Sequence, residues 1–135
     1  MTADMAKAIL AASIGRPFHI RFGGEVALQH AQDVARIFIA AAETDADAAH
    51  ICNLRGDVVT VEQFIKRIEA AEPTAQITYD AENPLPFPSD LDDSDLSGLI
   101  GAIPHTSLDA AIAGDLAAYR ALVSENRIDL GQLDA

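Results

Sequence analysis

Four histidines are the side chains of this sequence best suited to acid–base or metal chemistry: His19, His30, His50 and His105. None has a second ligand at the i, i+4 or short-loop spacing that zinc sites use, so the sequence does not predict a metal centre. His30 is near enough to Asp33 for a hydrogen bond. Because no Ser or Cys has an obvious place as a nucleophile beside this pair, a catalytic triad is not supported.

Arg55 is the candidate for binding an anionic ligand. Its guanidinium is planar and always charged, and on a turn beside Gly56 it could clamp a carboxylate. The alternative is an ion pair with Asp57 or with the acidic residues of 80–95, a stretch that contains no Lys or Arg. For that stretch, a solvated loop is a simpler interpretation than a metal or partner site.

Composition limits the classes of function. At 135 residues, half of them hydrophobic, the chain is long enough for one domain with a real core. Nine basic against twenty-one acidic residues give a formal net charge of −12, which argues against binding nucleic acid or anionic membranes. No segment approaches the length of a membrane span and no signal peptide is recognisable, so we expect a cytoplasmic protein. The single cysteine, Cys52, allows no disulfide within the chain, and we expect it in the core.

The strongest local signal lies in residues 51–65. It predicts a buried strand at 51–54, a turn at Gly56 and a helix that begins after Thr60. Thr60 and Gln63 have the spacing of a capping box, and Val59 and Phe64 have that of a hydrophobic staple. The apolar face of this helix consists of Val61, Phe64, Ile65, Ile68 and Ala71.

The other elements follow from periodicity and turn residues. Residues 18–22 and 26–30 alternate in polarity around Gly23 and Gly24, which predicts a β-hairpin. Residues 32–42 predict a helix that is apolar around most of its circumference, and hence buried on more than one side. We further predict helices at 2–14, 91–99 and from 108, a strand at 76–79, an extended proline connector at 83–88, and a loose or helical tail at 125–135.

This mixed α and β pattern contains few strands for so many apolar helices. The excess of apolar surface indicates a missing partner surface.

Several short motifs occur in an order that resembles a known family. They are His30 followed by Asp33-Val34-Ala35, Asn53 at a strand end, the helix start Val59-Thr60-Val61-Glu62, and the run Leu99-Ile100-Gly101 followed by Pro104-His105-Thr106-Ser107-Leu108. Together they resemble the C-terminal part of the extended short-chain dehydrogenases/reductases, the NAD-dependent epimerase/dehydratase family. The resemblance covers residues 2–122 and implies a single substrate-binding domain at 1–124, of mixed α/β class.

The resemblance also implies what this chain lacks. Family members carry a Gly-rich cofactor loop and a Tyr-x-x-x-Lys pair, and neither is present, since Tyr79 is followed four residues later by Asn83 and Tyr119 by Val123. We therefore expect a truncated chain that is inactive alone and has no cofactor site, NAD(P) being implied for a complete member. Its expected partner is a Rossmann-containing chain or a second copy of itself.

The family cleft implies substrate-binding roles for several positions and structural roles for others. The substrate-binding positions are Arg55, Arg21, Lys7 and Thr2, and the structural positions are His30, Asp33 and Asn53. Nucleotide-sugar members have an Arg where this chain has Val26, so a small polar or carboxylate substrate is expected rather than a nucleotide sugar.

Two other classes of function stay open. One is a small acidic interaction module that dimerises through the first helix and the helix containing Ile37. The other is an unrelated small α+β enzyme with a pocket beneath the hairpin.

Overall fold

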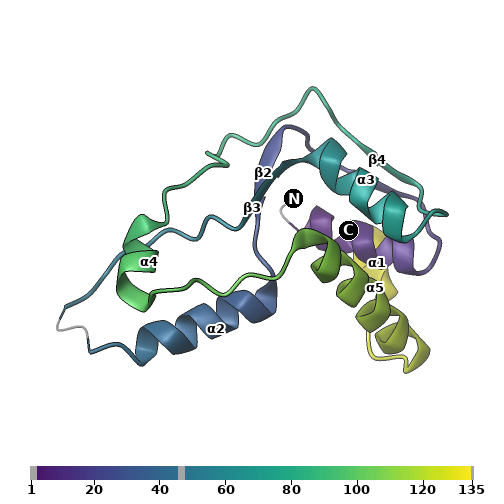
Figure 1. Cartoon of the computed structure of the whole chain (residues 1–135). Coiled ribbons are helices and arrows are strands. Elements are labelled where there is room, and N and C mark those ends of the chain that lie inside the picture. The colour runs from purple at the N-terminus through teal and green to yellow at the C-terminus, as the bar shows by residue number, and fades with distance from the viewer. Residues whose placement is uncertain (1–2, 46–47, 135) are drawn as a thin grey trace.

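The computed structural model describes residues 3–45 and 48–134, which form a mixed α/β fold as predicted (Figure 1). The elements in chain order are α1 (Asp4–Ser13), β1 (Phe18–Ile20), β2 (Glu25–Leu28), α2 (Ala31–Ala42), β3 (Asp57–Thr60), α3 (Val61–Ala71), β4 (Ile77–Tyr79), α4 (Ser94–Ile100), α5 (Leu108–Ser124) and a 3-10 helix (Leu130–Asp134). Helices α1, α3 and α5 pack together at one end, and α2 and α4 lie side by side at the other (Figure 1).

The main core lies around α1. Met5, Ala8, Ile9 and Ala12 are buried, and they join apolar side chains of the strands, α3 and α5. A smaller cluster forms where Leu133 packs on α1, so the segment expected as a loose or helical tail ends in a 3-10 helix docked on the domain.

The predicted β-hairpin is wrong. β1 pairs with β4 in parallel, and β2 pairs with β3 antiparallel, so the two segments belong to different two-stranded sheets. Gly23 forms a parallel bridge with Pro84, and a Cβ on Gly23 would lie 2.7 Å from the carbonyl oxygen of Asp80. Because Gly23 and Gly24 have no side chain, the backbone of the connector after β4 can lie close against them. They do not form the two-residue turn of a hairpin.

The predicted buried strand at 51–54 is also wrong. Ile51 is 94% exposed, Cys52 is half-buried, and the strand begins after Gly56, where Asp57 pairs with Leu28. Gly56 has φ 65°, and a Cβ there would overlap the carbonyl oxygen of Leu28. The chain turns against β2 at this glycine, so pairing starts only after it.

The start of α3 is confirmed in detail. The Gln63 amide donates to the Thr60 hydroxyl at 3.1 Å, and the Thr60 amide donates to the Gln63 side-chain oxygen at 2.9 Å. Phe64 and Ile68 are buried on the predicted face, while Ala71 at its end is exposed.

Helix α2 is not buried on several sides, contrary to the prediction. Two side chains of this fully described helix are buried, Asp33 and Ile37, whereas Phe38 and Ile39 are 69% and 60% exposed. The reason is its position, because α2 packs against α4 and lies apart from the main core (Figure 1). None of the helices in the described ranges is long and apolar enough to span a membrane.

Candidate functional site

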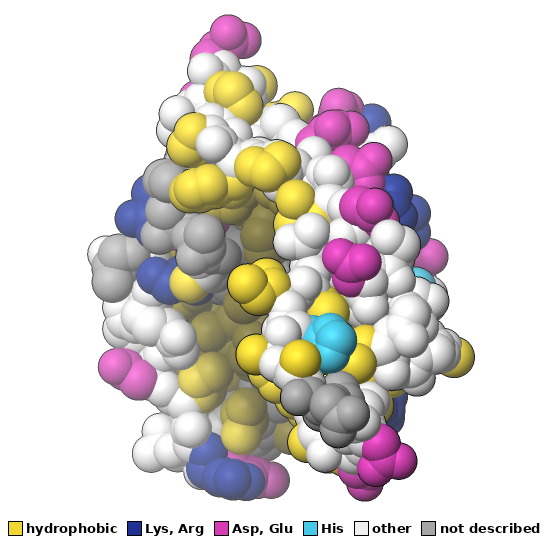
Figure 2. Space-filling view, turned by 90° about the vertical axis from the view of Figure 1, so that its left-hand side faces the viewer, with side chains coloured by type: hydrophobic (Ala, Val, Ile, Leu, Met, Phe, Trp, Pro, Cys, Tyr) yellow, Lys and Arg dark blue, Asp and Glu magenta, His cyan; other side chains and the backbone are white. Residues whose placement is uncertain are grey.

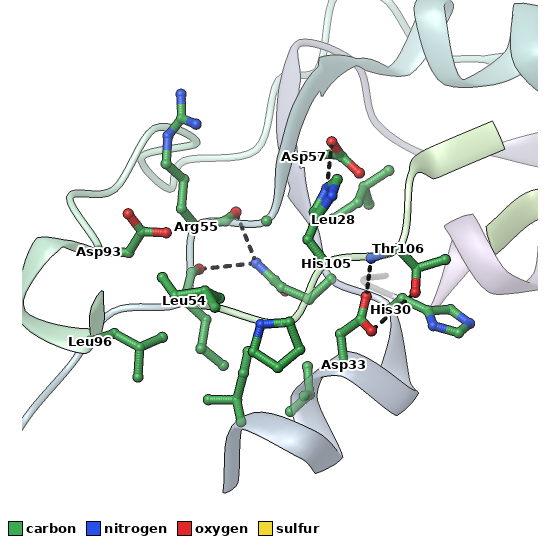
Figure 3. Close-up of a pocket in the computed structure, with 16 residues that line it drawn as sticks. Leu28, His30, Asp33, Leu54, Arg55, Asp57, Asp93, Leu96, His105 and Thr106 are labelled. Carbon is green, nitrogen blue, oxygen red and sulfur yellow. Dashed lines mark hydrogen bonds and ion pairs between the residues drawn. The ribbon is translucent and has the colours of Figure 1, made fainter. Parts of the chain in front are cut away.

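A cavity of about 290 Å³ lies between α2, α4 and the loops that precede β3 and α5 (Figure 3). We call it the α2–α4 cavity. Its lining consists of Leu28, Gln29, His30, Asp33, Val34, Ile37, Leu54, Arg55, Gly56, Asp57, Asp93, Leu96, Ile103, Pro104, His105 and Thr106. Three residues that the sequence singled out, His30, Asp33 and Arg55, are thus brought to one place.

Asp33 joins α2 to the segment before α5. The residue is 5% exposed, and its carboxylate accepts hydrogen bonds from the backbone amide of Thr106, from the Thr106 hydroxyl at 3.0 Å and from the Arg36 guanidinium at 3.1 Å. Burial by itself would raise the pKa of Asp33, but the Thr106 hydrogen bonds and the charges of His30 and Arg36 outweigh it, so the pKa is lowered. The carboxylate is therefore ionised and closes one side of the cavity.

His30 stands at the entry of α2. Its carbonyl oxygen accepts the amides of Asp33 and Val34, at 3.0 and 3.1 Å, which begins the helix. Its ring does not cap the helix, and Nδ1 is buried with no hydrogen-bond partner in the described part of the chain. Nε2 lies 3.9 Å from Oδ1 of Asp115.

A second histidine, His105, forms a pair that the sequence did not reveal. Its Nε2 lies 3.2 Å from Oδ1 of Asp57 on β3 (Figure 3). An imidazole held by a carboxylate is a group that can accept a proton, and this one is half-exposed at the cavity. The neighbouring Thr106 hydroxyl is occupied with Asp33, so the pair does not complete a nucleophilic triad. No spacing rule connects residues this far apart, which is why sequence reasoning missed the pair.

Gln29 is also a site residue that the sequence analysis missed. Its side-chain amide donates to the carbonyl oxygens of Leu54 and Arg55, at 3.1 and 3.2 Å. These bonds hold the loop before β3 against the end of β2, and all three residues line the cavity.

Arg55 adopts one of the two arrangements considered for it. Its Nε donates to Oδ1 of Asp90 in the acidic stretch at 2.6 Å, and this carboxylate raises the pKa of the guanidinium. Figure 3 shows the side chain directed away from the other labelled residues. Close by, the Asn53 side chain donates to the carbonyl of Asp92 at 3.0 Å, which ties the same loop to the same acidic stretch.

Arg21 lies outside the cavity and is engaged with Asp4. The fully buried Asp4 carboxylate accepts Nε, Nη2 and the backbone amide of Arg21, at 2.9, 2.7 and 3.1 Å. These hydrogen bonds lower the pKa of Asp4 against the opposing effect of burial. Lys7 is half-buried on α1 and does not line the cavity, and Thr2 is outside the described residues.

The described residues do not fit a dinucleotide or a metal at the positions considered. A pyrophosphate needs the free amides of a glycine turn that opens a helix. The Gly23 amide instead donates to the carbonyl of Asn83 at 3.0 Å, and Gly24 leads into a strand. No group of three His, Cys, Asp or Glu side chains within 3–45 and 48–134 is placed to hold a metal ion.

No protein-family model and no curated protein matches this sequence. Solved structures do match. A partial consensus L-threonine 3-dehydrogenase has a TM-score of 0.75 and 23% identity over 89% of this chain and 43% of its own. UDP-glucose 4-epimerase from Thermotoga maritima, solved with UDP-glucose, has a TM-score of 0.71 and 21% identity over 88% of this chain and 40% of its own.

These similarities define the class of fold. The chain has the fold of the C-terminal part of extended short-chain dehydrogenase/reductase structures, as its motifs predict. It spans about two fifths of the length of the two enzymes. At this level of identity the likeness establishes the fold, and the activities of the two enzymes belong to them.

Proposed function

We propose that this chain is the substrate-binding part of an NAD(P)-dependent oxidoreductase or epimerase of the extended short-chain type. The observation that carries the proposal is the fold correspondence over nearly nine tenths of the chain with a threonine dehydrogenase and a sugar-nucleotide epimerase. The α2–α4 cavity supports it, because its size is near that of small-ligand sites and its lining combines apolar side chains with polar and charged ones that could orient a ligand.

The proposed substrate is small and polar or carries a carboxylate. Arg55 lies at the edge of the cavity and forms an exposed ion pair with Asp90. A substrate carboxylate could replace Asp90 as the partner of this guanidinium. A nucleotide sugar is not proposed, because Val26, which stands where nucleotide-sugar members have an Arg, is buried and apolar.

The cofactor is proposed to be held elsewhere. NAD(P) supplies or accepts a hydride in such enzymes, and the glycine pair of this chain does not fit its pyrophosphate. The chain's own contribution is then to bind the substrate and to exclude water from it. A cytoplasmic location is part of the same proposal and can be tested by cell fractionation.

A direct test is to titrate the 135-residue chain with NADH and NADPH and follow cofactor fluorescence. We expect no saturable binding of either nucleotide up to about 1 mM, the upper end of ordinary substrate affinities. Saturable binding in the micromolar range would overturn the proposal that the cofactor is held elsewhere.

The proposed partner is a nucleotide-binding half that packs on the uncovered apolar surface. Phe38 and Ile39 of α2 are exposed, and Ile51 lies exposed in an extended segment that has no strand partner among the described residues. Figure 2, which views the molecule from the left-hand side of Figure 1, shows hydrophobic side chains gathered around a hollow. Exposed apolar surface of this kind marks interaction sites.

A second candidate function is the small acidic interaction module. The exposed face of α2 favours it, whereas the larger apolar residues of α1, Met5, Ile9 and Leu10, are buried inside the chain and are not available to the expected dimer interface. The module predicts a monodisperse dimer that unfolds cooperatively without any ligand. A substrate-binding part without its other half predicts early melting or aggregation.

Light scattering and thermal melting of Phe38→Gln separate the two candidates. A dimer that becomes monomeric with this variant supports the module, whereas reduced aggregation without a defined oligomer supports the substrate-binding part. Phe87→Gln is the matched control, because Phe87 is similarly exposed, at 63% against 69% for Phe38, but lies in the proline connector.

A further inference from the structure

A second and larger cavity, of about 440 Å³, lies between α1, α5 and the end of β2. We call it the α1–α5 cavity. Its apolar lining includes Met5, Ile9, Phe64, Leu108 and Ile112. Its polar lining is formed by Gln29, His30, Asp57, Thr106 and Asp115. Neither Lys nor Arg occurs among the described residues that line it; its titratable side chains are the carboxylates of Asp57 and Asp115 and the imidazole of His30.

Asp115 interrupts an apolar helix face. It follows Ala111 by four residues and Leu108 by seven, and all three line the cavity, so the helical repeat places the carboxylate beside them. Burial raises the pKa of Asp115, which the charge of His30 only partly offsets. A carboxylate on a face that otherwise packs apolar side chains breaks the local pattern, and such breaks are expected at functional sites.

The carboxylate has no hydrogen-bond donor in the described part of the chain. The nearest basic atom, Nε2 of His30, is 3.9 Å from Oδ1, which is too long for a hydrogen bond. Nδ1 of the same ring is buried and also lacks a partner. Nδ1 of His30 is thus the buried polar atom at this end of the cavity that needs an explanation, and the Asp115 side chain beside it is 41% exposed and open to a ligand.

We propose that the α1–α5 cavity binds a small amphipathic amine, with its ammonium group on Asp115 and its apolar body against Phe64, Met5 and Ile9. An ammonium supplies a charge-assisted hydrogen-bond donor to Asp115, whose side chain is 41% exposed and accepts no hydrogen bond from the described residues. Asp57 provides a second carboxylate, one oxygen of which is already held by His105. The inference does not rest on the proposed function, because the amine site is defined without NAD(P).

Calorimetric titration of the 135-residue chain with benzylammonium tests the proposal. Benzyl alcohol and benzoate are the neutral and anionic probes of the same shape. We expect benzylammonium to bind saturably with one site per chain. Benzyl alcohol and benzoate should bind roughly tenfold more weakly or worse, because neither can form the hydrogen bond between an ammonium and the Asp115 carboxylate. Equal binding of benzylammonium and benzyl alcohol would refute the role of charge.

Two variants locate the binding. Asp115→Asn should weaken benzylammonium binding by roughly tenfold or more, whereas Asp109→Asn, an exposed change of the same charge on the same helix, should leave it unchanged. Ala6→Leu places a larger side chain at the cavity from an exposed position of α1, and should abolish binding without disturbing the core. If both Asp variants weaken binding equally, or if Ala6→Leu has no effect, the amine is attracted by net charge and the proposed site is wrong.

Discussion

Replacing Asp33 with asparagine tests the joint between α2 and the segment before α5. The carboxylate accepts two bonds from Thr106 and one from Arg36, and it lies in the first turn of α2. A hydrogen bond to a charged group contributes about 1.5–3 kcal/mol and a first-turn acid about 0.3–1 kcal/mol. The asparagine oxygen can keep one acceptor role, so we expect Asp33→Asn to lower the free energy of unfolding by about 2–4 kcal/mol.

Urea unfolding at pH 7, followed by circular dichroism, measures this loss. Asp95→Asn is the control, because Asp95 lies in the first turn of α4 but is exposed, so it should cost less than about 1 kcal/mol. Amide exchange at Thr106 gives a local readout and should accelerate in the Asp33 variant. If the two variants cost the same, the tertiary role assigned to Asp33 is wrong.

The effect should also depend on pH. The pKa of Asp33 is lower in the folded chain than its ordinary value of 3.8. A carboxylate with a lowered folded pKa contributes stability above its unfolded pKa, and this contribution is lost as pH falls through the folded pKa. The difference between the wild-type chain and Asp33→Asn should therefore narrow below about pH 4. A difference that stays constant from pH 7 to pH 2.5 contradicts the assignment.

Three further changes probe the parts of the fold that position the cavities. Gly56→Ala should cost more than about 2 kcal/mol in urea unfolding, because the φ of 65° disfavours a side chain and a Cβ would overlap the neighbouring strand. Asp4→Asn should cost about 2–4 kcal/mol, since it removes the buried partner of Arg21, and the loss should shrink at low pH because the pKa of Asp4 is also lowered. Thr60→Ala should cost about 1 kcal/mol by removing the cap of α3.

Matched controls accompany these three changes. Gly114→Ala, in α5 with open space around its Cβ position, should be neutral or stabilising by about 0.5–1 kcal/mol. Asp90→Asn removes an exposed partner of Arg55 and should cost less than about 1 kcal/mol. Ser107→Ala removes the corresponding cap of α5 and should cost about as much as the Thr60 variant. If Gly114→Ala costs as much as Gly56→Ala, the reason given for Gly56 is wrong. If Asp90→Asn costs as much as Asp4→Asn, the reason given for Asp4 is wrong. A Thr60→Ala variant with unchanged stability contradicts the role of Thr60 as the cap of α3.

The local features of this chain were predictable because they depend on neighbours in sequence. The capping box of Thr60 and Gln63 involves atoms three residues apart, and the buried face of α3 follows from helical spacing. The glycine at 101 ends α4 with φ 78°, as expected for a helix exit, although α4 begins only at Ser94 rather than at 91.

The strand pairings were not predictable in the same way. Alternation identified β1 and β2 as strands but carried no information on their partners, and β4 lies far along the chain from β1. The apolar composition of 51–54 predicted burial, yet Ile51 is exposed, because burial depends on whether another element covers the segment. For α2 the same reasoning holds, since the helix packs mainly against α4 and most of its apolar side chains are left uncovered.

By itself, the sequence determined the class of the fold, the positions of most helices and the motif order that points to the C-terminal part of an extended short-chain dehydrogenase/reductase. These depend on periodicity, caps and motif spacing, which are properties of short stretches. Only the tertiary structure decided that Asp33 bonds Thr106, that Asp57 pairs with His105, and that Asp115 stands beside His30. Each of these contacts joins segments far apart in the chain, and they meet only because the packing of α1, α5 and the strands brings them together.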